Sequence, residues 1–401
     1  ERAGAKQAGR MAVSELDLSG NWNYPTSITA GAGAIDQLPA CCRQLGMTAP
    51  LLVTDPGLAA LPMVDAALAR CRAAGLDTGR FSAIKANPNG RNVADGVVAF
   101  KGGEHDGVIA LGGGSAIDAA KAIALMVGQG RPLWDFEDLG DNWQRVELAG
   151  IAPIVAVPTT AGTGSEVGRA ALITDEERQV KRIIFHPKLL PSQVILDPEL
   201  TLGLPASITA ATGMDALSHN LEALCSSVYH PMAEGIAVEG IRLVREYLPV
   251  VVADGGNIAA RMQMMVASSM GATAFQKGLG AMHALAHPLG ALYDAHHGLL
   301  NAILMPYVLV ANREEIAGRM ERVSRYIGLR NPGFSGFLDW VLELRSGIGI
   351  PHKLAAIGID LERHQLIGTM AINDPCAASN PVQFNAGQYS EIFVRAVTGD
   401  L

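Results

Sequence analysis

GVIALGGGSAIDAAKAIALMV, residues 107–127, shows how the first half of the chain is built. It starts with the apolar run GVIALGGGS (107–115), which ends in glycines, and continues with AIDAAKAIALMV (116–127), which has a helix-like composition. Two more apolar runs, LLVTD (51–55) and IAPIVAVPTT (151–160), also end in turn-forming residues. Repeated strand, turn and helix are typical of a parallel sheet with both faces covered. We therefore predict an N-terminal α/β domain with a Rossmann-like parallel sheet.

Beyond Pro205 the pattern changes to helical periodicity with few strand signals. Stretches such as ITAATGMDALSHNLEAL (208–224) and NIAARMQMMVASSMGATAF (257–275) are examples. We predict that the second half is an all-α domain, with the boundary near residues 198–206. The expected division is an N-terminal extension that is poorly ordered (1–20), an α/β domain (21–200) and an all-helical domain (201–401).

The composition of the 401 residues excludes several classes of partner. The net charge is −8 and no dense Lys/Arg run occurs, which argues against nucleic acid and anionic membranes as partners. No apolar stretch reaches the ~20 residues that a membrane-spanning helix needs. The five cysteines are scattered and form no CxxC pair, so we expect reduced cysteines in a cytoplasmic protein.

The glycine turn GGGSAIDAAK, residues 112–121, is a candidate phosphate-binding site. Glycines at a strand-to-helix junction let backbone N–H groups approach an anion, and the helix N-terminus adds partial positive charge. The strict dinucleotide fingerprint needs a glycine where this chain has Ile117, so the fingerprint is not matched. On this turn alone, an ordinary tight turn remains an alternative.

A second turn, PTTAGTGSE (158–166), follows another predicted strand and supplies hydroxyls and glycines. Ligands of open α/β sheets bind beyond the carboxyl ends of the strands, so two neighbouring turns could hold one pyrophosphate. Asp55 ends a third strand, and a carboxylate there can accept hydrogen bonds from a ribose. The alternative is that Asp55 only begins a turn before Pro56. Together the three turns favour a dinucleotide, and NAD over NADP.

A carboxylate and an imidazole four residues apart suggest one half of a metal site. Asp215 and His219 lie in the helix-like stretch GMDALSHNLEAL (213–224), where this spacing places both on one face. Such a pair alone can also be an ordinary surface hydrogen bond. Two more imidazoles would complete a mixed O/N set that suits a first-row divalent ion. GLGAMHALAHPLGALYDAHHG (278–298) offers four histidines: His283, His287, His296 and His297.

Spacing alone leaves open which two of these four histidines bind a metal. His283 and His287 are four apart, but Pro288 follows directly and is expected to disturb a helix there. His296 and His297 are adjacent, so they cannot both face one ion if the backbone is extended. Neither pairing is favoured by the residues themselves.

Four motifs in this order and separation resemble the iron-containing (group III) alcohol dehydrogenases, a family that includes lactaldehyde reductases and 1,3-propanediol dehydrogenases. The resemblance runs from about Pro25 to ASNP (378–381). It implies a dehydroquinate synthase-like fold, with an NAD-binding α/β domain, an all-helical metal-binding domain and a homodimer or larger assembly. The motifs are GGGSAIDAAK, PTTAGTGSE, GMDALSHNLEAL and GLGAMHALAHPLGALYDAHHG.

The resemblance also implies roles for individual residues. His287 would be a histidine that binds no metal, lies near the nicotinamide and relays protons. The metal would be Fe²⁺, with Zn²⁺ as an alternative. The implied metal ligands are Asp215, His219, His283 and His297. The implied NAD contacts are Asp55, Asn87, Gly112, Gly113, Gly114, Ser115, Asp118, Thr159, Thr160, Thr163, Leu172 and Lys181.

The expected activity is interconversion of a small alcohol and its aldehyde or ketone by hydride transfer to or from NAD. A lyase of the dehydroquinate synthase type, which has no net redox change, is one alternative, and a non-catalytic metal- or nucleotide-binding protein is another. Two positions depart from the family pattern: His296 stands where relatives commonly have proline, and Val382 replaces an arginine. The identity of the alcohol and the role of His296 stay open at this stage.

Overall fold

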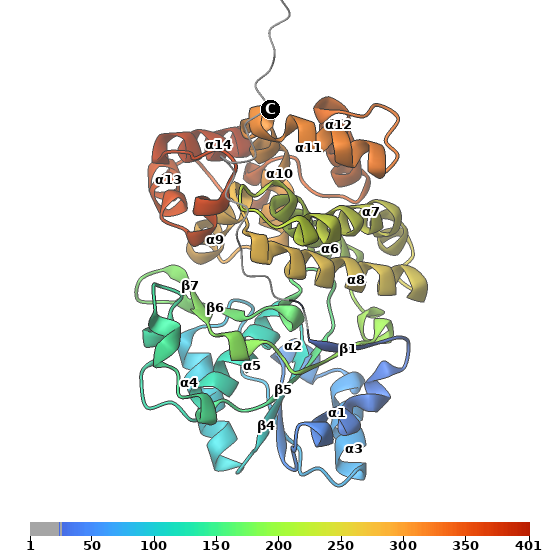
Figure 1. Cartoon of the computed structure of the whole chain (residues 1–401), viewed down its shortest axis with the longest axis vertical. Coiled ribbons are helices and arrows are strands. Elements are labelled where there is room, and N and C mark those ends of the chain that lie inside the picture. The colour runs from blue at the N-terminus through green and yellow to red at the C-terminus, as the bar shows by residue number, and fades with distance from the viewer. Residues whose placement is uncertain (1–23, 25) are drawn as a thin grey trace, which may run out of the picture.

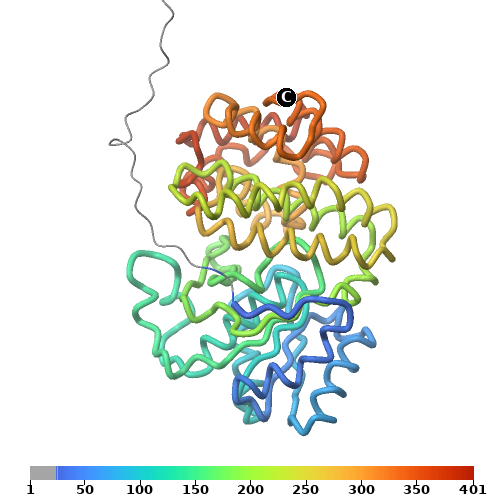
Figure 2. The backbone as a smooth tube through the Cα atoms, turned by 45° about the vertical axis from the view of Figure 1, so that its right-hand side comes forward, coloured from blue at the N-terminus to red at the C-terminus, as the bar shows by residue number. Residues whose placement is uncertain are grey.

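The computed structural model describes residue 24 and residues 26–401, and it consists of a sheet-containing half below a helical half (Figure 1). Residues 1–20, the predicted extension, lie outside the described residues. Figure 2 shows the same division by colour, with the blue-to-green part of the chain below and the yellow-to-red part above. The two-part architecture predicted from the sequence is therefore confirmed.

Six strands of the described chain form one parallel sheet, in the order β1-β8-β5-β4-β2-β3. Gly112 at the end of β4 lies beside Pro158 at the end of β5, so the turns that follow these strands emerge side by side. The sheet strands are β1 Ser27–Ala30, β2 Pro50–Val53, β3 Gly79–Phe81, β4 Gly107–Gly112, β5 Ile154–Pro158 and β8 Gln193–Leu196.

Helices cover both faces of this sheet because its strands are apolar on both sides. In β4, Val108 and Ala110 join the core beneath α5, whereas Ile109 and Leu111 join the core beneath α1 and α3. This alternation follows from the two-residue period of a strand. The helices of this half are α1 Leu38–Gln44, α2 Pro56–Ala59, α3 Pro62–Ala73, α4 Gly90–Gly102 and α5 Gly114–Met126.

A two-stranded antiparallel hairpin, which the sequence did not predict, lies between the sheet and the helical half. It consists of β6 Ala170–Asp175 and β7 Val180–Phe185, and β7 contacts α9 of the helical half. After the hairpin, β8 completes the sheet, and the 3₁₀ turn η8, Pro198–Thr201, leads to the first long helix at Ala206. This crossing falls inside the predicted boundary region, and we keep 200/201 as the proposed domain boundary.

The helical half packs around α6, in which every residue from Thr209 to Cys225 is buried. It has one continuous hydrophobic core. None of the helices in the described chain is long and apolar enough to span a bilayer. The helices are α6 Ala206–Cys225, α7 Pro231–Ala253, α8 Ile258–Ala274, α9 Ala281–Tyr293, α10 His297–Ala311, α11 Arg313–Tyr326, α12 Phe334–Gly347, α13 His364–Ile372 and α14 Ala386–Thr398.

Three of these helices, α7, α9 and α10, continue through an interior proline: Pro249, Pro288 and Pro306. The sequence predicted a disturbance at Pro288, but α9 does not end there, because the helix is buried on both sides of this residue. In α10, Pro306 cannot donate a hydrogen bond to the carbonyl of Ala302. The buried guanidinium of Arg345 donates to the carbonyls of Ala302 (3.1 Å) and Ile303 (2.9 Å) instead. Tertiary contacts thus replace what the proline removes.

Candidate active site

The carboxyl ends of β2, β4 and β5 open into a cavity of about 950 Å³, whose lining comes from both halves of the molecule. All residues predicted to bind metal, NAD or protons line it, with the exception of Gly112. A Cβ at Gly112 would lie 2.7 Å from the Cβ of Ala116, so this glycine permits the close turn from β4 into α5. Its predicted contact with NAD remains a prediction.

The two glycine turns contact each other at the cavity wall. A Cβ at Gly114 would lie 2.5 Å from Thr163, and one at Gly113 would lie 3.4 Å from Thr160. The N–H of Thr159 also donates to the carbonyl of Gly112 (2.9 Å). Gly113 is the N-cap of α5 and has no side chain to cap it, so backbone N–H groups at this helix start can face an anion. The arrangement suits a pyrophosphate held between the turns.

Asp55 combines both roles that the sequence left open. One carboxylate oxygen, Oδ1, accepts the N–H of Leu58 (2.9 Å) and caps α2, which is the turn-forming role. The other oxygen, Oδ2, lies 3.7 Å from the position of a Cβ at Gly112, beside the first glycine turn. Asp55 lines the cavity, so its second oxygen can accept a ribose hydroxyl.

Asp118 lines the cavity, but hydrogen bonds within the protein already occupy its oxygens. One oxygen accepts the hydroxyl of Ser165, and the other accepts the N–H of Leu172 (3.0 Å). The fully buried ammonium of Lys121 lies 3.3 Å away and also donates to the carbonyl of Ser165 (3.0 Å). Asp118 therefore holds the second glycine turn and β6 against α5, and its predicted contact with NAD remains a prediction.

The remaining predicted NAD residues, Asn87, Ser115 and Lys181, also line the cavity. The amide of Asn87 donates to the carboxylate of Asp294, which crosses from the sheet half to the loop between α9 and α10. The hydroxyl of Ser115 donates to the carbonyl of Ala86. Burial lowers the pKa of Lys181 from its ordinary value, and nearby carboxylates oppose this only in part. Its amino group lies in the cavity wall.

Four donor groups converge at the side of the cavity formed by the helical half. Asp215 and His219 lie on one face of α6, His283 lies on α9, and His297 is the first residue of α10. One donor atom from each of these residues lies within 4.8 Å of all the others. The Nε2 atoms of His219 and His297 lie 3.9 and 3.8 Å from Oδ1 of Asp215. One carboxylate and three imidazoles fit a first-row divalent cation.

The other ring nitrogens orient two of these imidazoles. Nδ1 of His219 donates to the carbonyl of Gly162 (3.2 Å), and burial lowers the pKa of His219 to about 4. Nδ1 of His283 donates to Glu222 (2.7 Å). Burial alone would lower the pKa of His283, but the effect of the nearby carboxylates, Glu222 first, is larger and raises this pKa. Nδ1 of His297 is buried without a hydrogen-bond partner in the described structure, and burial, followed by the neighbouring imidazoles, lowers its pKa. In His219 and His283 the Nε2 lone pair remains available for a metal.

His287 lies beside this cluster but is not part of it. Its Nδ1 donates to the carboxylate of Asp374 (2.8 Å), which belongs to the loop before η11, Pro375–Ser379. The ring of His287 stacks on that of His297, with centroids 5.5 Å apart. The pairing of His283 with His287 that spacing alone allowed is not seen in the four-donor group.

His296 is exposed and lies at the edge of the cavity. Its Nδ1 accepts the N–H of Leu299 (3.3 Å), so the side chain caps the start of α10. This local role accounts for a polar residue at the position without requiring contact with a metal.

Three residues near the site were not found by the sequence reasoning. Glu222 and Asp374 orient His283 and His287, and the amide of Asn301 donates to Asp215 (2.9 Å) from one turn after His297. Glu222 lies seven residues after Asp215, a helical spacing that could have been noticed. Asp374 comes from a distant segment, and no local pattern indicates it.

Each half of the chain matches a family model. Residues 25–198 match the model described as "Iron-containing alcohol dehydrogenase", and residues 209–397 match "Fe-containing alcohol dehydrogenase family, C-terminal". The chain belongs to the iron-containing alcohol dehydrogenase family. As a member of this metal-containing oxidoreductase family, it is an alcohol dehydrogenase and not the lyase that shares the fold.

Individual relatives agree with this family over nearly the whole chain. A 4-hydroxybutyrate dehydrogenase from Cupriavidus necator is 36% identical, covering 93% of this chain and 99% of the relative. The crystal structure of a 1,3-propanediol oxidoreductase has a TM-score of 0.89 and 35% identity, covering 94% of this chain and 99% of the other. The structure of a sulfoacetaldehyde reductase from Bifidobacterium kashiwanohense in complex with NAD+ has a TM-score of 0.85 and 27% identity, covering 95% and 100%.

Proposed function

We propose that this alcohol dehydrogenase uses NAD and one divalent cation to interconvert a small alcohol and its aldehyde or ketone. The observation that carries the proposal is the four-donor group of Asp215, His219, His283 and His297 in the same cavity as the two glycine turns. A metal site or a nucleotide turn alone would have other uses, but a shared cavity brings a substrate oxygen and a nicotinamide together.

The chain's own groups would bind and orient the reactants. The two glycine turns would hold the pyrophosphate, and Asp55 would accept a ribose hydroxyl. Asp215 and the three imidazoles would hold the cation. When bound, the cation supplies Lewis-acid polarisation of the substrate oxygen, and NAD supplies the hydride acceptor or donor. Walls from both halves would surround the reacting groups.

His287 would move the proton that an alcohol loses on oxidation. Its Nδ1–H is held by Asp374, so Nε2 is the nitrogen that can accept a proton from the cavity side. Asp374 stabilises the cationic imidazole that results. In the reduction direction the same ring would return the proton.

The substrate would be a small molecule. The ring edge of Phe275 lies against His219, with centroids 5.2 Å apart, and limits the space beside the four-donor group. Relatives named for 4-hydroxybutyrate and 1,3-propanediol support short alcohols that carry a second polar group. The panel for the test therefore contains short primary alcohols, diols and hydroxy acids with their aldehydes.

We propose Fe²⁺ as the cation, with Zn²⁺ as the alternative. The donors accept either ion, and intrinsic affinity favours zinc over ferrous iron, so the support for iron comes from the family. Elemental analysis of protein purified without added metal measures which ion is present.

We further propose a homodimer or larger homo-oligomer in the cytoplasm. The five cysteines, all in the described part of the chain, are buried and form no disulfide, which supports a reducing compartment. The family supports the oligomer, and light scattering of the purified protein measures it.

Replacement of His283 by alanine tests the proposal. His283→Ala removes one of four donors, so we expect loss of the bound cation and of at least about 99% of NAD-dependent activity, since metal chemistry supplies several kcal/mol. Metal content, NADH formation with the alcohol panel and NAD+ binding to the metal-free protein are measured together.

The matched control is His364→Ala, because His364 bonds Ser390 outside the cavity. The control should keep both metal and activity. If His283→Ala keeps its metal and its activity, the ligand assignment is wrong. If wild-type protein with metal forms no NADH with any alcohol of the panel, the proposed reaction is wrong.

A further inference from the structure

Glu222 is a buried carboxylate that the proposed reaction does not use. It lies on α6, seven residues after Asp215 and three after His219, so all three side chains share one face of the helix. Only 5% of Glu222 is exposed. Burial of a carboxylate costs free energy unless hydrogen bonds and positive charge compensate it. The groups around Glu222 therefore indicate its role.

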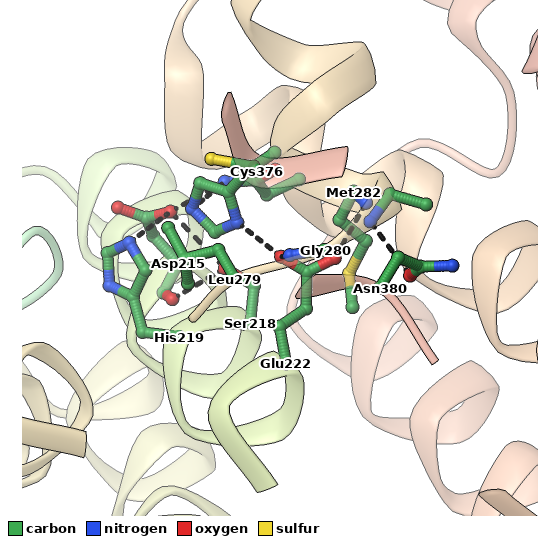
Figure 3. A network of polar contacts seen from close by, with 12 residues as sticks. Asp215, Ser218, His219, Glu222, Leu279, Gly280, Met282, Cys376 and Asn380 are labelled. Atoms are coloured by element: carbon green, nitrogen blue, oxygen red, sulfur yellow. Dashed lines mark hydrogen bonds and ion pairs between the residues drawn. The ribbon is translucent and has the colours of Figure 1, made fainter. Parts of the chain in front are cut away.

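Those groups all belong to the start of α9. Glu222 accepts the backbone N–H of Gly280 (2.9 Å), the N–H of Met282 (2.6 Å) and Nδ1–H of His283 (2.7 Å). Figure 3 shows Glu222 between Gly280 and Met282 on one side and the Asp215–His219 pair on the other. Gly280 is the N-cap of α9 and has no side chain of its own to cap the helix. Glu222 thus caps α9 from a different helix, where a negative charge is favourable.

The same carboxylate fixes the tautomer of His283. An ionised carboxylate can only accept hydrogen bonds, so Nδ1 of His283 must carry the proton. Nε2 then keeps its lone pair, and this nitrogen faces the other three donors, as its 3.1 Å distance to the Asn301 amide indicates. A carboxylate behind a metal-binding imidazole commonly sets ring orientation and raises basicity.

We propose that Glu222 is the positioning residue that assembles the metal site from two helices. This inference rests on the proposed metal function. Asp215 and His219 come from α6, and His283 comes from α9. Glu222 joins these two helices, because its carboxylate accepts both the backbone N–H groups at the start of α9 and Nδ1–H of the metal ligand His283. It therefore sets the position of α9 and the ring orientation of His283 before any cation binds.

The test compares two variants that each remove a cap from α9. Glu222→Gln keeps the side-chain volume but offers one acceptor oxygen for three donors, and its amide cannot take the place of the second oxygen. Asn380→Ala is the matched control, because Oδ1 of Asn380 accepts the N–H of Ala281 (3.0 Å) and does not contact His283. Both variants weaken the helix start, but only the first removes the negative charge that contacts His283.

The probe is Co²⁺, titrated into metal-free protein and followed by its visible absorption. We expect Glu222→Gln to weaken Co²⁺ binding tenfold to a hundredfold. Asn380→Ala should change it less than about threefold while lowering the melting temperature. NAD+ should bind the metal-free form of both variants as it binds wild type. If the two variants weaken Co²⁺ binding equally, or if neither weakens it, Glu222 is only a helix cap and the proposal is overturned.

A second measurement remains informative if Glu222→Gln does not fold, or if the metal assignment itself is wrong. Wild-type protein labelled with ¹⁵N histidine should show His283, without metal, as the tautomer with its proton on Nδ1. A proton on Nε2 would overturn the proposal. Failure of the proposed metal function can be distinguished from failure of the Glu222 proposal. In the first case, wild type would bind Co²⁺ no better than His283→Ala does.

Discussion

The imidazole of His287 and the carboxylate of Asp374 form a buried pair at 2.8 Å beside the four-donor group. Burial alone would raise the pKa of Asp374, but the nearby imidazole outweighs it and lowers this pKa. The carboxylate is therefore charged at neutral pH and accepts Nδ1–H of His287. This hydrogen bond leaves Nε2 of the ring for the proton of an alcohol.

Asp374→Asn should lower kcat for alcohol oxidation by about tenfold to a hundredfold. A general acid–base group accelerates a reaction by roughly 10²–10⁴-fold, and this change removes only the charge beside His287 and not the imidazole itself. The Kd for NAD+ should stay within about twofold. Steady-state kinetics and a nucleotide titration measure the two quantities.

Asp360→Asn is the control for this prediction. Asp374 caps the N–H of Cys376 (2.9 Å), and Asp360 likewise caps the N–H of Glu362 (3.0 Å). Asp360 is exposed, whereas the second oxygen of Asp374 accepts Nδ1–H of His287. An unchanged kcat in Asp374→Asn would mean that the proton of the alcohol leaves by another route.

For individual residues, the sequence predicted which residue types form the site but not which contacts orient each side chain. His283 and His287 have the same four-residue spacing as Asp215 and His219. Of His283 and His287, however, only His283 belongs to the four-donor group. The difference lies in Glu222 and Asp374, which contact the two rings from distant segments. Local spacing contains no information about such contacts, and only resemblance to the family separated the two histidines.

Among the elements, β2 and β4 are joined at their starts by one side chain. Asp106, just before β4, accepts the N–H (2.7 Å) and the hydroxyl (2.7 Å) of Thr48 and the N–H of Ala49 (3.0 Å), just before β2. Partial burial would raise the pKa of Asp106, but these hydrogen bonds outweigh it and lower the pKa below its ordinary 3.8. A lowered pKa means that folding favours the charged form.

The stabilisation from Asp106 should therefore be present above about pH 4 and be lost as pH falls through the lower, folded-state pKa. We expect Asp106→Asn to reduce the free energy of unfolding by roughly 1 kcal/mol at pH 7. The difference from wild type should shrink below pH 3.8. Urea unfolding of both metal-free proteins across this range measures it.

Asp65→Asn serves as the comparison variant, since Asp65 forms only an exposed ion pair with Arg80 at 3.3 Å. It should change stability little at any pH. A difference between Asp106→Asn and wild type that is the same at pH 3 and pH 7 would contradict the role assigned to the charge.

The elements that the sequence predicted best are those with the strongest patterns. The runs before residues 55, 112 and 158 are central, buried strands, and the long helices after Pro205 carry clear periodicity. Edge strands β1 and β3 are short and partly exposed, so their residues show no apolar run. The hairpin β6–β7 alternates buried and half-buried residues and lies over the cavity, a position that follows from tertiary contacts.

In the whole molecule, the cavity exists only because two halves meet. The sheet half contributes the glycine turns, and the helical half contributes every member of the four-donor group. The sequence predicted both halves, but it could not predict their relative placement. That placement depends on close contacts such as Gly162, where a Cβ would lie 2.7 Å from the carbonyl of Thr212 on α6.

The hydrogen bond from His219 to the carbonyl of Gly162 crosses between these halves. We expect it to couple the binding of NAD+ to the binding of the cation. A nucleotide that fixes the position of the second glycine turn would also fix the imidazole of His219, which would bind the cation. Whatever factor NAD+ applies to Co²⁺ affinity, Co²⁺ must apply to NAD+ affinity, and we expect at least about fivefold. Paired calorimetric titrations measure both factors. If both affinity factors equal one, the enzyme binds NAD+ and the cation independently. If both exceed one, a shortage of metal in the cell also weakens the binding of NAD+ to this enzyme.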